Sequence, residues 1–191
     1  AALKGKDITN SGTVNAANVA VDAVNKFTNT PTGNLVAKEN ATVNATNADV
    51  AGNVSGSNVT LNATGNLTVE EGANVNATNG TATLKGENIT NSGSVVSPNG
   101  TIDVDATNNF TNTDTGNLKA KEAVTIDAKE ATVGGNVTSD NATVDVNATN
   151  VTVSPNATIT AKEDVTLNAT ETLNIGENAT VKSTDGDAAL K

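Results

Sequence analysis

The sequence lacks seven residue types altogether, and they include most of the large side chains that fill ordinary protein cores. Arg, Cys, Gln, His, Met, Trp and Tyr are absent, and the aromatic residues are limited to Phe27 and Phe110. Compact globular cores usually rely on large aromatic and aliphatic side chains to fill irregular space. Val, Ala, Leu and Ile must do this here, so we expect a narrow core of regular cross-section.

These absences also exclude several classes of partner. Without cysteine, neither disulfides nor thiolate metal sites can stabilise the chain. The chain has 11 lysines and 21 acidic residues. The resulting net charge of −10, with only two aromatic residues, argues against nucleic-acid binding. No apolar run approaches the length of a membrane-spanning helix, and no signal peptide is recognisable. We therefore expect no nucleic-acid partner and no membrane insertion.

The missing residue types bear on catalysis as well. General bases, nucleophiles and oxyanion-stabilising groups most often come from His, Cys, Tyr or Arg, none of which is present. Only carboxylates, hydroxyls and lysines remain. We predict that the chain is not an enzyme, with no catalytic residues and no cofactor.

What the sequence does contain is a short repeat that runs from end to end. The pattern is apolar, any residue, apolar, any residue, then Ala or Gly, and its copies lie about 21 residues apart on average. The central apolar positions are Leu3, Val21, Val43, Leu61, Leu84, Val104, Ile126, Val146, Leu167 and Leu190. We use the term rung for one such unit of about 21 residues.

Each rung carries two further apolar positions with alternating neighbours, which is typical of short strands with one inward face. We expect the second set to be Ile8, Phe27, Val50, Leu67, Ile89, Phe110, Val133, Val151 and Leu173. The third set is Val14, Leu35, Val54, Val75, Val95, Leu118, Val137, Ile159 and Val181. Three strands and three turns per rung predict an all-β fold: a right-handed parallel β-helix of nine to ten rungs.

The chain is expected to form a single β-solenoid domain over residues 1–191. A four-rung block at residues 2–83 matches residues 84–165, which indicates duplication, and a ninth rung at 166–187 and a partial rung follow. Asn10 and Asn29 occupy equivalent places in neighbouring rungs, as do Asn91 and Asn112. We expect each pair of side-chain amides to stack and hydrogen-bond along the axis.

The turns and strands carry a family resemblance. Asn-Ser-Gly turns (Asn10 to Gly12, Asn91 to Gly93) and Thr-Leu-Asn-Ala or Thr-Ile-Asp-Ala strands (Thr60 to Ala63, Thr125 to Ala128) recur on rungs of about 20 residues. The sequence thereby resembles filamentous-haemagglutinin-like exoproteins. The resemblance implies a long β-helix exported by two-partner secretion and displayed on a cell surface as an adhesin, although that family's secretion domain is not recognisable in this chain.

Two columns of outward side chains are candidate binding sites. The best candidate for an ion site is a group of four carboxylates, in which Asp105 and Asp127 should stack in one column: Asp103, Asp105, Asp127 and Asp145. No calcium-binding motif accompanies them, and we predict no metal. A threonine column suggests ice binding but is interrupted by Ala20, Asp103 and Asp145; its members are Thr42, Thr60, Thr83, Thr125 and Thr166.

Asn-x-Thr sequons are frequent, which a chain rich in Asn and Thr also produces by chance. They include those at Asn40, Asn44, Asn58, Asn62, Asn66, Asn88, Asn136, Asn147 and Asn168. A glycosylated surface stalk is therefore one alternative, and a solenoid that binds ice, calcium or glycans is another. The expectation that ranks first is an extracellular, cell-surface structural or adhesive segment of a stalk or filament. It would associate end to end or continue in a longer array, with possible contacts to cell-surface glycans.

Overall fold

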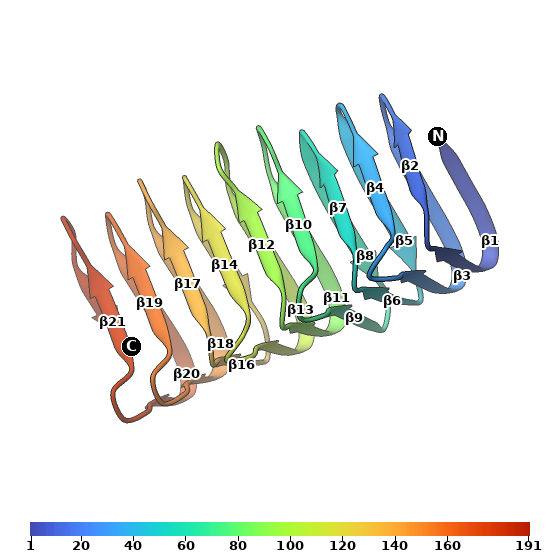
Figure 1. Ribbon diagram of the computed structural model, residues 1–191. Coiled ribbons are helices and arrows are strands. Elements are labelled where there is room, and N and C mark those ends of the chain that lie inside the picture. Colours follow the sequence, from blue (N-terminus) through green and yellow to red (C-terminus); the bar gives the residue numbers. More distant parts are fainter.

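The computed structural model describes residues 1–191 as a stack of β rungs without any helix (Figure 1). No segment could therefore cross a membrane as a helix. The strands are β1 (Ala2–Asn10), β2 (Thr13–Ala16), β3 (Val19–Asn29), β4 (Asn34–Ala37), β5 (Asn40–Ala45), β6 (Asn47–Val50), β7 (Asn53–Gly56), β8 (Asn58–Ala63), β9 (Asn66–Val69), β10 (Asn74–Ala77), β11 (Ala82–Asn91), β12 (Ser94–Ser97), β13 (Ile102–Asn112), β14 (Asn117–Ala120), β15 (Val124–Asp127), β16 (Glu130–Val133), β17 (Asn136–Ser139), β18 (Val144–Val153), β19 (Thr158–Ala161), β20 (Val165–Ile175), β21 (Thr180–Ser183) and β22 (Ala188–Leu190).

The strands form two parallel sheets that run the length of the molecule. The 9-stranded sheet takes one short strand from each rung, in the order β2-β4-β7-β10-β12-β14-β17-β19-β21. The 13-stranded sheet bends around a corner and supplies two faces. In some rungs one long strand, such as β3 or β13, passes through the corner; in others the strand is interrupted there, as between β5 and β6. The predicted all-β solenoid of about 21 residues per rung is confirmed.

The solenoid has three outer faces, which we number in the order in which the chain of each rung passes through them. Face 1 carries the strands around the central apolar positions, and face 2 carries the second set of positions beyond the corner. Face 3 is the outer side of the 9-stranded sheet. On every face the side chains alternate between a buried inward column and a partly exposed outward column, as in β8.

The first and third apolar columns match the expectation at every position. Leu3 pairs with Val21, and the column continues without a break to Leu167 and Leu190. On face 3 the inward column begins with Val14 and Leu35 and ends at Val181. Burial fixes this register, because a shift of one residue would turn each apolar set outward.

The second column departs from the expectation in two rungs. Phe27 stacks on Ala48 and not on Val50, and Phe110 stacks on Ala131 and not on Val133. The predicted positions of Val50 and Val133 in this column are therefore wrong. A phenylalanine in one rung takes up more of the core width, and alanine in the next rung leaves room for it. Both phenylalanines and both alanines are almost fully buried.

Val50 and Val133 lie instead in an inward column next to the second corner of the rung, together with the paired asparagines. Its members in order are Asn10, Asn29, Val50, Val69, Asn91, Asn112, Val133, Val153 and Ile175. The predicted amide stacking is confirmed: Asn10 Nδ2 donates to Asn29 Oδ1 at 2.9 Å, and Asn91 Nδ2 donates to Asn112 Oδ1 at 2.8 Å.

These buried asparagines also bind the backbone of the adjoining turns. Asn112 Nδ2 donates to the carbonyls of Gly116 and Asn136, at 3.1 and 3.2 Å, and Asn29 binds Gly33 and Asn53 in the same way. A Cβ at position 116 would lie 2.3 Å from Asn112 Oδ1, so glycine is required where the turn approaches the amide.

At the corner between faces 1 and 2, successive rungs differ in length by one residue. The register between β1 and β3 slips between Gly5 and Asp7, because the corner of the second rung holds one extra residue. The same slip occurs between β11 and β13, and between β18 and β20. Over the first seven rungs the corners alternate between one residue (Lys6, Thr46, Glu87, Lys129) and two (Val24-Asn25, Thr64-Gly65, Thr107-Asn108).

Candidate functional site

Face 1 carries two outward columns of polar side chains, and they contain the predicted site residues. The threonine column runs Ala20, Thr42, Thr60, Thr83, Asp103, Thr125, Asp145 and Thr166. The column beside it runs Lys4, Asp22, Asn44, Asn62, Lys85, Asp105, Asp127, Asn147 and Asn168. The expected register of both columns is confirmed, with Asp105 beside Asp127 in consecutive rungs.

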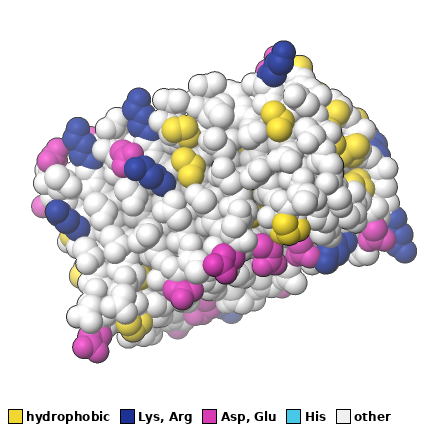
Figure 2. Space-filling view, in the orientation of Figure 1, with side chains coloured by type: hydrophobic (Ala, Val, Ile, Leu, Met, Phe, Trp, Pro, Cys, Tyr) yellow, Lys and Arg dark blue, Asp and Glu magenta, His cyan; other side chains and the backbone are white.

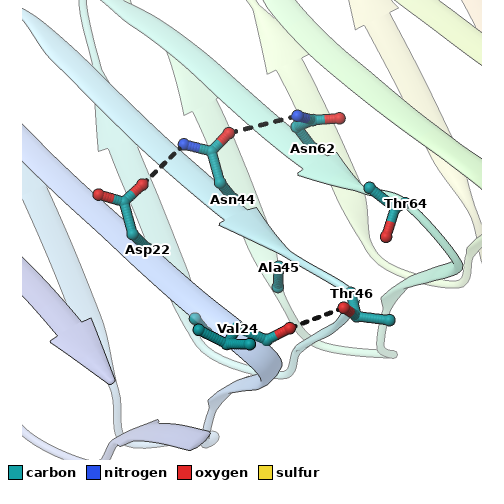
Figure 3. Close-up of a pocket in the computed structure, with 8 residues that line it drawn as sticks. Asp22, Val24, Asn44, Ala45, Thr46, Asn62 and Thr64 are labelled. Carbon is teal, nitrogen blue, oxygen red and sulfur yellow. Dashed lines mark hydrogen bonds between the residues drawn. The ribbon is translucent and has the colours of Figure 1, made fainter. Parts of the chain in front are cut away.

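Hydrogen bonds and ion pairs link neighbours along the second of these columns. Asn44 Nδ2 donates to Asp22 Oδ1 at 3.0 Å, and Asn62 Nδ2 donates to Asn44 Oδ1 at 3.3 Å, as Figure 3 shows. Lys85 Nζ lies 3.6 Å from Asp105 Oδ2, and Asn147 Nδ2 donates to Asp127 Oδ1 at 2.9 Å. Most side chains in this column therefore have a hydrogen-bond or ion-pair partner in an adjacent rung.

The four predicted aspartates do not come together as one group. Asp103, Asp105 and Asp127 line a shallow hollow of about 410 Å³ with Lys85, Thr83 and Thr125. Asp145 lies outside that hollow, where the Thr143 hydroxyl donates to its carboxylate at 2.8 Å. No group of three or more acidic side chains lies close enough together to hold a metal ion.

Partial loss of hydration raises the pKa of Asp103 above its ordinary value. The nearby carboxylate of Asp127 raises this pKa further, while Lys85 lowers it. Because the folded state favours the protonated acid, ionisation of Asp103 opposes folding. Its unfavourable contribution is absent below the ordinary aspartate pKa and complete once the pH exceeds the raised folded-state pKa.

We expect Asp103→Asn to raise the free energy of unfolding at neutral pH and to leave it unchanged in acid, below the ordinary pKa of aspartate. The gain should stay below about 1 kcal/mol, because Asp103 is exposed and solvent screens its charge. Urea denaturation at neutral and acidic pH, each in low and high salt, measures this. An equal gain at both pH values would show that charge is not the cause.

The structure also shows a threonine column that the sequence analysis missed. It lies on face 2 and is uninterrupted over five rungs, at Thr68, Thr90, Thr111, Thr132 and Thr152. The recurring Asn-x-Thr triplets at Asn66, Asn88, Asn109 and Asn150 were the signal, because Asn and Thr two residues apart point to the same side of a strand. The hydroxyl array is a single column, with asparagine or glutamate beside it.

The sequon asparagines all lie on the outside, and several of their amides are bonded between rungs. Asn58 donates to Asn40 at 3.1 Å, Asn88 donates to Asn66 at 3.1 Å, and Asn168 donates to Asn147 at 3.5 Å. These amides therefore form hydrogen-bonded ladders on the surface. That role accounts for the many asparagines without glycosylation.

Two hollows of equal size occur on the corner between faces 1 and 2. The first has a volume of about 280 Å³ and spans β3, β5 and β8; Figure 3 shows Asp22, Asn44 and Asn62 in a row along one side, with Val24, Thr46 and Thr64 at the corner. The second, also about 280 Å³, lies two rungs further on, over β8, β11 and β13, between Thr64 and Thr107. Each lies over a one-residue corner flanked by two-residue corners.

The flank of the molecule in Figure 2 has no large hydrophobic area. Its hydrophobic side chains are scattered in small groups, and most of the surface is neither charged nor hydrophobic. Comparisons with protein-family models, with curated proteins and with solved structures found no match for this chain.

Proposed function

We propose that this chain is a rigid structural segment of an extracellular stalk or filament on a cell surface, and that it has no catalytic activity. The observation that supports this most directly is the continuity of the inward columns. Central apolar side chains stack without a break from Leu3 to Leu190. A continuous core with parallel strands bonded rung to rung resists bending and transmits force along its axis.

The distribution of apolar surface supports association through the ends of the solenoid. The large hydrophobic side chains that are exposed are Val24, Ile175 and Leu190, and the last two lie in the final rungs. At the opposite end, Leu3, Ile8 and Val14 are only partly buried. The sides of the stack are polar, so a second copy, or further rungs, would bury most apolar area by stacking on an end.

The extracellular location is supported by the resemblance to exported haemagglutinin-like proteins and by the absence of cysteine, which leaves no thiol to oxidise outside the cell.

Electron microscopy of the 191-residue chain at high concentration tests the structural role. We expect fibres built from end-to-end copies, with a repeat of about 4.8 Å along the fibre axis. Discrete particles about 45 Å long at every concentration would show that the chain does not associate by itself. Antibody labelling of intact source cells tests the location, and labelling only after the cells are broken would contradict it.

A further inference from the structure

The two corner hollows arise from one feature of the chain, the alternation in corner length. Where a corner holds two residues, as at Val24-Asn25 or Thr64-Gly65, it is one residue longer than the corners of the rungs beside it. Where it holds one, at Thr46 or Glu87, that residue lines a hollow together with residues of the longer corners on either side. An extra residue in one strand of a pair bends that strand away from the ladder, which is the usual effect of a β-bulge.

The hollows are equivalent positions on a repeating scaffold, so their separation is fixed. Thr46 and Glu87 occupy the same place in rungs that are two apart, and Thr64 forms the ridge between them. Two rungs correspond to roughly 9.6 Å along the axis. The surface thus presents two binding positions in line, parallel to the solenoid axis and at a set spacing.

The groups that line the hollows suit a ligand rich in hydroxyl groups. Asp22 lines the first hollow and its carboxylate can accept further hydrogen bonds, whereas both polar atoms of the Asn44 amide are already bonded within the ladder. Lys85, Glu87 and Asp105 line the second hollow, and Asn62 and the Thr64 hydroxyl line both. Asn62 uses its Nδ2 group to bond Asn44, which leaves its Oδ1 free to accept from a ligand. Val24, with 76% of its surface exposed, supplies an apolar contact at the rim.

We propose that this corner binds a neutral, extended β-1,4-linked polysaccharide that lies parallel to the solenoid axis. Such a chain has a two-fold backbone and presents the same edge at every second sugar, with a repeat close to the spacing of the hollows. Its hydroxyl groups can bond the carboxylates, the Asn62 amide oxygen and the Thr64 hydroxyl, and its C–H groups can contact Val24 at the first hollow. A polyanionic polysaccharide would be repelled by a chain of net charge −10. This binding activity goes beyond the structural role proposed above and does not depend on it.

Affinity should come from the use of both hollows together. Each hollow is shallow and has no aromatic platform, so a single disaccharide should bind weakly. When one part of an oligosaccharide is held in the first hollow, the next part is kept at high effective concentration near the second. Cellohexaose is expected to bind about tenfold more tightly than cellobiose.

NMR titration of the isotope-labelled protein tests this, using cellobiose, cellohexaose and the β-1,3-linked laminarihexaose as probes. We expect cellohexaose to shift the amide signals of Asn44, Thr46, Asn62, Thr64 and Glu87, and laminarihexaose, with a different backbone repeat, to bind several-fold more weakly. Equal binding of the two hexasaccharides, or no saturable shifts with cellohexaose, would overturn the proposal.

Asn62→Leu removes the amide that lines both hollows, and we expect it to weaken cellohexaose binding about fivefold. The matched control is Asn53→Leu on face 3, where Asn53 Nδ2 donates to Asn34 Oδ1 at 2.8 Å in an equivalent surface ladder. That variant should bind as the unaltered chain does. An equal effect of the two substitutions would place any binding elsewhere. Val24→Asp, which places a hydrated charge at the rim of the first hollow alone, should abolish the advantage of cellohexaose over cellobiose, and an unchanged advantage would refute the use of both hollows.

Discussion

Replacing Ile126 with Asp is expected to lower the free energy of unfolding by about 4 kcal/mol or more. Ile126 is fully buried, and it stacks between Val104 and Val146 in the central inward column. A carboxylate there would have no partner, and the neighbouring apolar side chains cannot move away without breaking the ladder. Because each rung contacts only the rungs beside it, unfolding should start at this rung.

The measurement is urea denaturation followed by circular dichroism, with hydrogen exchange to locate the opening. We expect exchange to increase first in β13, β15 and β18 and least in β3 and β5. Thr125, the outward neighbour of Ile126, is a poor control because it lies between Asp103 and Asp145. Thr60→Asp is a better control, since Thr60 lies between Thr42 and Thr83. This substitution should lower the free energy of unfolding by less than about 1 kcal/mol. Similar losses for the two variants would contradict the assignment of inward and outward faces.

The second large effect is expected from Asn112→Val, which should cost about 2 to 4 kcal/mol. Valine fills this inward column in other rungs, so the substitution fits the available space. It removes the donor to the Gly116 and Asn136 carbonyls and the acceptor for the Asn91 amide. The bonds to Gly116 and Asn91 are buried, and the bond to Asn136 is partly buried. Buried polar groups left without a partner lose their hydration and gain nothing in return.

Denaturation of a matched pair isolates this effect. Asn53→Val breaks a surface amide ladder on face 3 and should cost less than about 1 kcal/mol. The double variant Asn91→Val, Asn112→Val should lose less than the sum of the single losses, because each single variant leaves one buried end of the Asn91–Asn112 hydrogen bond without a partner and the double variant removes both ends. An Asn112→Val variant as stable as Asn53→Val would mean that the internal amides do not support the turns.

The turns show that such inward residues act together with their surroundings. In the rungs of Asn29 and Asn112 the following turn ends in glycine, at Gly33 and Gly116, and a Cβ at either glycine would meet the amide oxygen at 2.3 Å. In the rungs of Val69 and Val153 the turn of equal length ends in a buried alanine, at Ala73 and Ala157. In turns of this length, asparagine with glycine and valine with alanine are therefore two alternative ways to close the corner.

The sequence by itself determined the fold class, the rung length, two complete inward columns and the stacking of the paired asparagines. Apolar residues recur at a regular spacing, and burial allows only the register that turns all of them inward. The outward columns followed from the same register, including Asp105 beside Asp127. The predicted threonine column at Thr42, Thr60 and Thr83 follows from the same alternation and is also correct.

Only the tertiary structure decided which residues meet near the corners. Val50 and Val133 were more apolar than Ala48 and Ala131, yet the alanines lie beside the phenylalanines because side-chain volume is balanced between adjacent rungs. The extra corner residues, and the hollows between them, could not be located from one rung alone. Corner length has meaning only relative to the rung stacked above or below, so the hollows arise when the strands are already paired.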